Sequence, residues 1–347
     1  MRKRALAMAA FAAAGVGGAA LGWAGERRLL RNELPGSDPE WSELRAPAGG
    51  RSRSIESFDG THLHVNVIGD EGNPTIVFAH GYALSHKVWH FQRRELADEF
   101  RVVTYDQRGH ADSEAAVSGD YSVQAFGRDL SAVIEATMVG SAPVVVVGHS
   151  MGGMSLLSFV EQFPDSLVDR LAGAVLMSTS GSDVVTGGLV SVSTAVLSGL
   201  RNRVTKRAFE TLGRRTKVPD PASTSSTDFS YMMTKLVGLS PDAAPAHVAF
   251  TEHLLLDCPN VVKASIGPLF TSLDLRQAAP LLKMPTLVVV GERDRLTPPA
   301  QARRLAGLLP DSRLVELPGI GHMTPLEAHA EVNALIRAFA RENLRGT

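Results

Sequence analysis

One serine of this chain lies in a pattern typical of a nucleophile. The segment Gly148–Gly152 reads Gly-His-Ser-Met-Gly, and it follows four consecutive valines and precedes a stretch with helical spacing. A serine on a sharp turn between a strand and a helix projects its hydroxyl above the sheet, and bulky residues at the two glycine positions would clash with that turn. The segment therefore predicts Ser150 as a nucleophile. Because a serine hydroxyl attacks poorly by itself, the prediction requires a base and an acid elsewhere in the chain.

Candidates for the base and the acid follow two later strands that the sequence predicts. His322 follows Gly321 in a loop before the last predicted helix, and Asp294 follows the predicted strand Thr286–Val290. Serine, then aspartate, then histidine is one of the chain orders in which such triads occur. We predict that His322 is the base and that Asp294 orients it.

Other residues could fill these two roles. Glu292 lies close to Asp294 and is an alternative acid, but it falls within the turn that leaves the strand. Among the other histidines, His110 precedes Ser150 and does not fit the chain order, and His329 lies on a helical face. The segment 106–110, Asp-Gln-Arg-Gly-His, is interpreted as a structural loop, either an ion pair or a turn that shapes the pocket.

Attack on a carbonyl also requires hydrogen-bond donors for the oxyanion that develops. His80, Gly81 and Tyr82 directly follow the predicted strand Thr75–Ala79. The backbone N–H of Tyr82 is predicted to be one donor, and the N–H of Met151, next to the nucleophile, the other. The alternative interpretation is that His80 and Gly81 only form a turn.

Strands and helices must alternate to place these loops at one edge of a sheet. Continuous apolar runs predict strands buried on both faces, and runs with helical spacing lie between them. The predicted fold class is α/β, with a mostly parallel central sheet and helices on both faces. The predicted strands are Ser52–Phe58, His62–Val67, Thr75–Ala79, Phe100–Tyr105, Val144–Val147, Leu171–Met177, Thr286–Val290 and Arg313–Leu317.

The alternation stops between about residues 181 and 278, where the pattern is mostly helical. This interruption predicts an inserted helical cap over the site. Its apolar side chains favour a hydrophobic acyl or alcohol group in the substrate, although they could equally form the core of the cap itself. They include Val196, Leu197, Leu200, Met232, Met233 and Leu236.

The bulk composition is that of a globular protein. Hydrophobic residues make up 44% and charged residues 20% of the 347 residues, and the formal net charge is -1. A chain so close to neutrality has no strong field to attract nucleic acid, so no nucleic-acid partner is expected. The single cysteine, Cys258, cannot form an internal disulfide and is expected to be a buried small apolar residue.

The first 25 residues have a different character from the rest. Arg2, Lys3 and Arg4 precede an uncharged, Ala- and Gly-rich stretch at 5–25, and arginines follow it. Its length suits a membrane-spanning helix, while a positive start before an apolar run also describes a secretory signal. We therefore expect residues 1–25 to be a signal peptide or a membrane anchor, so that the protein is exported or membrane-anchored in a bacterial cell envelope. Prolines and glycines at 26–50 predict a linker, which leaves 51–345 as the catalytic domain.

Taken together, these motifs resemble the α/β-hydrolase superfamily, and the resemblance spans about residues 52–344. The segments that carry it are 78–82, 106–110, 148–152, 291–294 and 321–322, and the run 81–94 is similar to actinobacterial members of unassigned substrate. The resemblance implies a Ser-Asp-His triad, two oxyanion donors and a helical cap, with no metal and no organic cofactor. Many relatives have a glycine where this chain has Ala111, which bears on the geometry of that loop.

The predicted function is that of a serine hydrolase acting through an acyl-enzyme on a small or lipophilic carboxylic ester. The alternatives are a cofactor-free haloperoxidase-like activity, a peptidase or another hydrolase with the same triad, or a non-catalytic binding protein of the same fold. Epoxide hydrolases and haloalkane dehalogenases resemble this fold but use aspartate where Ser150 stands. The oligomeric state and the identity of the substrate are not predicted.

Overall fold

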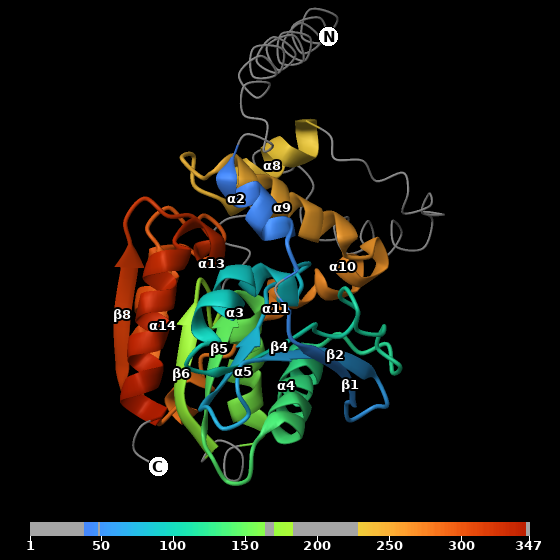
Figure 1. Cartoon of the computed structure of the whole chain (residues 1–347), viewed down its shortest axis with the longest axis vertical. Coiled ribbons are helices and arrows are strands. Elements are labelled where there is room, and N and C mark those ends of the chain that lie inside the picture. Colours follow the sequence, from blue (N-terminus) through green and yellow to red (C-terminus); the bar gives the residue numbers. More distant parts are fainter. Residues whose placement is uncertain (1–37, 48, 164–169, 183–227, 345–347) are drawn as a thin grey trace, which may run out of the picture.

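A computed structural model describes residues 38–47, 49–163, 170–182 and 228–344 of the chain. Its core is one eight-stranded sheet in the order β1-β2-β4-β3-β5-β6-β7-β8 (Figure 1). The pairs β1–β2 and β2–β4 are antiparallel, and the remaining neighbours are parallel. The predicted α/β class and the mostly parallel sheet are thus confirmed. The strands are β1 Arg51–Glu56, β2 His62–Ile68, β3 Thr75–Ala79, β4 Arg101–Tyr105, β5 Val144–His149, β6 Leu171–Met177, β7 Thr286–Gly291 and β8 Ser312–Leu317.

The central strands are apolar throughout because both of their faces are covered. In β5, Val144 and Val146 pack into one hydrophobic cluster, and Val145 and Val147 pack into another on the opposite face. Helices α4 (Val123–Thr137), α5 (Met151–Gln162) and α12 (Pro299–Ala306) supply the first cluster. Helices α3 (His90–Leu96), α13 (Thr324–Glu327) and α14 (His329–Leu344) supply the second. This is the two-sided covering that parallel strands require.

Helices α8 to α11 form a cap at one end of the sheet (Figure 1). They are α8 Asp228–Gly238, α9 Pro245–Asp257, α10 Asn260–Ile266 and α11 Leu269–Ser272. The described part of the predicted cap is therefore helical. Of the predicted apolar cap residues, Met232 and Met233 are half-buried and Leu236 is 47% exposed, while Val196, Leu197 and Leu200 lie outside the described residues.

The predicted linker at 26–50 contains a helix, α2 (Pro39–Arg45), that the proline-rich sequence did not suggest. One Asp38 carboxylate oxygen accepts the Glu40 N–H of α2, and the other accepts the N–H of Ala246 at the start of α9. Leu44 is buried in the same cluster as Ala246 and Leu254 of the cap. Residues 38–45 are thus packed against the cap (Figure 1).

The loop after β4 is held by a buried ion pair, in line with the structural interpretation of segment 106–110. The Arg108 guanidinium is fully buried and donates to both oxygens of Asp129, at 2.6 and 2.7 Å, and to Asp59 at 3.0 Å. Such a bidentate pair combines charge with fixed geometry. It anchors the loop to α4 and to the turn between β1 and β2.

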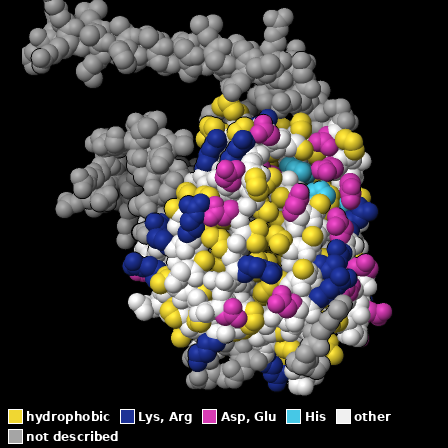
Figure 2. All heavy atoms as spheres, turned by 90° about the vertical axis from the view of Figure 1, so that its left-hand side faces the viewer, with side chains coloured by type: hydrophobic (Ala, Val, Ile, Leu, Met, Phe, Trp, Pro, Cys, Tyr) yellow, Lys and Arg dark blue, Asp and Glu magenta, His cyan; other side chains and the backbone are white. Residues whose placement is uncertain are grey.

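Charges of both signs are interspersed on the face formed by β8 and α14 (Figure 2). Salt bridges on this side join Arg303 to Glu316 and Arg341 to Glu99, each with a nitrogen–oxygen distance of 2.6 Å. This face therefore carries no extended patch of a single sign. Within the described residues, no helix is long and apolar enough to cross a membrane.

Candidate active site

Ser150 lies on a strained turn between β5 and α5. Its backbone angles are φ 52° and ψ −117°, a region that non-glycine residues rarely adopt and that costs of the order of 1–3 kcal/mol. The neighbouring glycines are required by close contacts. A Cβ added at Gly152 would lie 2.1 Å from the carbonyl oxygen of Ala79, and one at Gly148 would lie 2.6 Å from the backbone of Gly152.

Two hydrogen bonds from the end of β6 hold the Ser150 peptide in this conformation. The Ser150 N–H donates to the Met177 carbonyl at 2.9 Å, and the Thr179 hydroxyl donates to the Ser150 carbonyl at 2.7 Å. The Thr179 side chain also fills the space beside Gly153. The sequence offered no signal for Thr179, because its role depends on the pairing of β5 with β6.

His322 and Asp294 form a buried pair at the carboxyl ends of β7 and β8. The His322 Nδ1 lies 2.9 Å from the Asp294 Oδ2, and the two side chains are 6% and 0% exposed. Asp294 also accepts the N–H groups of Leu296 and Thr297 and the Thr297 hydroxyl, each at 2.8 Å. Burial opposes ionisation of Asp294, but the His322 charge and these hydrogen bonds outweigh it and lower the pKa of the carboxyl.

The charge of Asp294 determines which nitrogen of His322 carries the proton. An ionised carboxylate only accepts hydrogen bonds, so the His322 Nδ1 must be the donor in this pair. In the neutral imidazole the Nε2 is then free to accept a proton. This is the tautomer that a general base needs.

Glu292, the alternative acid, has a different contact. Its carboxylate accepts the backbone N–H of Gly319 at 2.8 Å, which closes the turn between β7 and the loop after β8. Asp294, rather than Glu292, is therefore the carboxylate that contacts His322.

The residue before the nucleophile brings His322 beside the elbow. The His149 Nε2 donates to the His322 carbonyl at 3.0 Å, and the two ring centroids are 4.9 Å apart. Burial and the neighbouring His322 lower the pKa of His149 to about 3, so its ring is neutral. His149 is thus a fixed spacer between the strand that carries Ser150 and the loop that carries His322.

The loop predicted to carry one oxyanion donor passes directly over Ser150. A Cβ added at Gly81 would lie 3.1 Å from the Ser150 Cβ, so the backbone approaches the nucleophile as closely as glycine allows. Tyr82 follows Gly81 in this loop. Met151 is the first residue of α5, where backbone N–H groups have no partner within the helix. Met151 is thus adjacent to Ser150, and Tyr82 is one residue away from the point where this loop approaches Ser150.

Two neutral histidines hold this loop in place. The His80 Nε2 accepts the Gln107 N–H at 2.9 Å, and the His110 Nε2 accepts the Ala83 N–H at 3.2 Å. Burial, the largest cause, lowers the pKa of His80 to about 3. The Gln107 side chain connects the loop to α5, because it donates to the His80 carbonyl at 2.5 Å and accepts the Ser155 hydroxyl at 2.9 Å.

An apolar cluster joins the cap to the two residues predicted to supply the oxyanion donors. The Tyr82 hydroxyl donates to the Lys263 carbonyl of α10 at 3.0 Å, and the Tyr82 ring meets the Phe270 ring edge-on at 5.3 Å between centroids. Cys258 is buried, as predicted, and burial raises the pKa of its thiol to about 11. The cluster comprises Ala83, Phe126, Met151, Cys258, Val262 and Ile266, with Tyr82 and Phe270 packed against it.

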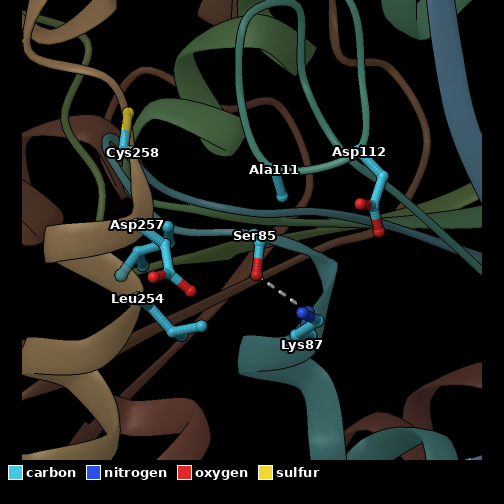
Figure 3. A pocket seen from close by; sticks show the side chains of 8 residues that line it. Ser85, Lys87, Ala111, Asp112, Leu254, Asp257 and Cys258 are labelled. Atoms are coloured by element: carbon cyan, nitrogen blue, oxygen red, sulfur yellow. Dashed lines mark hydrogen bonds between the residues drawn. The ribbon is translucent and has the colours of Figure 1, made fainter. Parts of the chain in front are cut away.

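A cavity of about 230 Å³ lies beside this cluster, between α9 and the loops that follow β3 and β4 (Figure 3). Its lining combines apolar groups with charges of both signs. None of the predicted triad residues lines this cavity. The Ser85 hydroxyl accepts the Lys87 N–H at 3.4 Å at the cavity edge. The lining residues are Leu84, Ser85, Lys87, Ala111, Asp112, Leu254, Asp257 and Cys258.

Among the described residues, one group of three side chains has the spacing of metal ligands, namely His64, His86 and Asp106. The Nδ1 atoms of His64 and His86 lie 3.0 and 2.9 Å from the same Asp106 oxygen. Burial opposes ionisation of Asp106, but these hydrogen bonds outweigh it, and its pKa lies well below the ordinary value. Because an ionised carboxylate only accepts, both nitrogens carry protons here. The group is thus hydrogen-bonded within itself, and it ties β2 and β4 to the segment after the oxyanion loop.

The sequence of this chain matches known proteins over most of its length. A profile of the Alpha/beta hydrolase family matches residues 76–335, a range that includes Tyr82, Ser150, Asp294 and His322. This chain belongs to the alpha/beta hydrolase family. The hydrolase is 25% identical over 287 residues to the AB hydrolase superfamily protein YisY of Bacillus subtilis, covering 82% of this chain and 98% of that protein.

Two further comparisons involve proteins described as esterases. The hydrolase is 26% identical to the bifunctional esterase/perhydrolase DCH of Acinetobacter calcoaceticus, over 83% of this chain and 99% of that protein. Its fold is similar to the solved structure of a thermophilic esterase from Thermogutta terrifontis, with a TM-score of 0.66, 24% identity and coverage of 85% and 99% of the two chains.

Proposed function

We propose that this hydrolase cleaves small or lipophilic carboxylic esters through an acyl-enzyme on Ser150. The observation that carries the proposal is the buried His322–Asp294 pair, 2.9 Å apart, in which His322 contacts His149, the residue before a serine on a strained elbow. The esterase relatives support the same reaction class. The apolar cluster around Met151 and Tyr82 favours an apolar acyl or alcohol group.

In the proposed mechanism, His322 removes the hydroxyl proton of Ser150 as the serine attacks the ester carbonyl. The N–H groups of Tyr82 and Met151 stabilise the oxyanion, and Asp294 stabilises the imidazolium that forms. His322 then protonates the leaving alcohol. Water repeats the cycle on the acyl-enzyme and releases the acid.

The first prediction concerns Ser150 itself. A fluorophosphonate probe should label the folded wild-type protein at Ser150, and a panel of p-nitrophenyl esters should be hydrolysed with a chain-length optimum. Ser150→Ala should abolish labelling and reduce kcat by about 10⁴-fold or more, because the covalent route is lost. Ser158→Ala, a change at a buried serine within α5, is the matched control and should retain activity.

The same experiment separates the proposal from its alternatives. No adduct on Ser150 in folded wild-type protein would mean that the chain is a binding protein rather than an enzyme. If the protein hydrolysed peptides but not esters, the proposed esterase activity would be wrong and a peptidase activity would take its place. A perhydrolase activity is a second candidate, because the relative DCH is described as an esterase/perhydrolase. Adding hydrogen peroxide would then divert the acyl-enzyme to a peracid without removing the dependence on Ser150.

We further propose that residues 1–25 export the protein or anchor it to a membrane of the bacterial envelope. The support is the cationic start followed by the uncharged stretch at 5–25, and these residues lie outside the described structure. In a bacterial host the full-length protein should fractionate with membranes or appear outside the cytoplasm. Mass spectrometry of its N-terminus distinguishes a cleaved signal from an anchor. An intact protein found only in the cytoplasm would contradict both.

A further inference from the structure

We propose that Glu327 is a positioning residue that holds the base His322 and fastens it to the helical cap. This inference rests on the proposed function, in which His322 is the base. Glu327 ends the short helix α13, five residues after His322, and nothing in its sequence position singled it out.

The carboxylate of Glu327 binds the backbone on both sides of His322. Its Oε2 accepts the N–H of Gly321 at 3.2 Å, and its Oε1 accepts the N–H of Met323 at 3.1 Å. The backbone N–H groups of the two residues that flank His322 are therefore held by one side chain. Because the ring of His322 is carried by that backbone, the contacts set the direction in which the imidazole points.

The same carboxylate also binds the cap. The Glu327 Oε2 accepts the N–H of Ser240, in the segment between α8 and α9, at 2.7 Å. A second link runs directly between the backbones, because the His322 N–H donates to the Gly238 carbonyl at 3.1 Å. The two segments touch closely, since a Cβ added at Gly321 would lie 2.5 Å from the Ser240 nitrogen.

The chemistry of these contacts requires an anionic group. Three N–H groups converge on Glu327, and an ionised carboxylate offers two oxygens that only accept. A glutamine of the same length offers one oxygen and directs an NH₂ group at the remaining donors. Hydrogen bonds to a charged acceptor contribute more than neutral ones, so a single substitution weakens the whole set.

The arrangement couples the cap to the base. If the cap segment 238–240 moved away, the Ser240–Glu327 and Gly238–His322 hydrogen bonds would break together, and the His322 loop would lose two of its restraints. The described contacts with the cap therefore help to hold the base.

The variant E327Q tests this proposal on the full-length protein. The second-order rate of fluorophosphonate labelling of Ser150 should fall by about 10- to 100-fold, because a small displacement of a catalytic group costs that much. With an ester substrate, kcat should fall while KM changes little, and the pH profile of labelling should shift because the surroundings of His322 change. Hydrogen exchange should accelerate in both the 236–244 and the 319–325 segments.

The controls separate a positioning role from a merely structural one. E342Q, a change at an exposed glutamate of α14, should leave the labelling rate and its pH profile unchanged. The proposal would be overturned if Ser150 of E327Q were labelled at the wild-type rate and the pH profile of labelling did not shift. Faster exchange only in 319–325 would overturn the coupling to the cap. Wild-type protein that is not labelled at all would instead refute the proposed function.

If E327Q does not fold, wild-type protein provides the test. Phosphonylation of Ser150 should slow exchange in 236–244 and 319–325 together, because the adduct engages the base and the base is bonded to the cap. Protection confined to one of the two segments would overturn the coupling.

Discussion

Backbone strain at single residues is concentrated around the proposed site. In the described part of the chain, the non-glycine residues with positive φ are Ala83, Ala111, Ser150 and Ser178. Ser150 is the proposed nucleophile, Ala83 follows the oxyanion loop, and Ser178 follows the strand that holds the Ser150 peptide. Strain of this kind persists only where surrounding contacts over-determine the backbone. Here the Ser150 N–H donates to the Met177 carbonyl, the Thr179 hydroxyl donates to the Ser150 carbonyl, and the Ala83 N–H donates to the His110 ring.

Ala111 provides a test of such strain away from the triad. Its φ is 43°, so the alanine adopts the left-handed conformation that glycine accommodates freely, and its side chain is exposed. Ala111→Gly removes strain but loosens the unfolded chain, and the free energy of unfolding should change by less than about 1 kcal/mol. Ala111→Val should cost about 2 kcal/mol, because a β-branched side chain is strongly disfavoured at positive φ.

Urea unfolding of the two variants measures this difference. Equal stability of Ala111→Gly and Ala111→Val would contradict the strained conformation. Ala111 thus adopts a positive φ at a cost in conformational energy.

At the scale of elements, the sequence predicted best those that are buried on both faces. The valines of β5 face two different clusters, so their run is apolar without alternation and is recognisable as a central strand. Helix α2 was missed because its seven residues follow a proline-rich stretch and its stability comes from elsewhere. Asp38 bonds to the start of α9 and Leu44 packs against the cap, and neither contact is local in sequence.

At the scale of the whole molecule, buried neutral histidines link stability to pH. His80 and His149 are fully buried, and their pKa values are lowered to about 3, chiefly by burial. In the unfolded chain the pKa of histidine is about 6.5. Below that pH the histidines of the unfolded chain take up protons that those of the folded protein do not. The contribution of these two histidines to stability is therefore fully present above about pH 6.5 and is lost as the pH decreases toward 3.

The size of this effect can be tested with one variant. Between neutral pH and about pH 5, each of the two histidines should lower the free energy of unfolding by about 2 kcal/mol. His149→Gln retains a donor for the His322 carbonyl but does not titrate. From about pH 7 to about pH 5, the free energy of unfolding of this variant should decrease by about 2 kcal/mol less than that of wild type. Urea unfolding at both pH values measures it, and an unchanged difference would show that His149 is protonated in the folded state.

The residues of the proposed triad could be found in the linear chain because each stands next to a strong local signal. Ser150 lies between glycines after a valine run, and Asp294 and His322 follow recognisable strands. Loops at the carboxyl ends of parallel strands meet at one edge of the sheet, so the positions of these residues in the chain predict that they lie close together.

The residues that hold this set in place emerged only from the folded chain. The Thr297 hydroxyl donates to the Asp294 carboxylate within one loop. Thr179, Gln107 and Glu327 act through hydrogen bonds to backbone groups that are distant in sequence. No residue type or spacing predicts such a hydrogen bond, because any backbone N–H or carbonyl can be the partner. The docking of α2 and the link between cap and base were likewise decided by which surfaces the fold brings into contact.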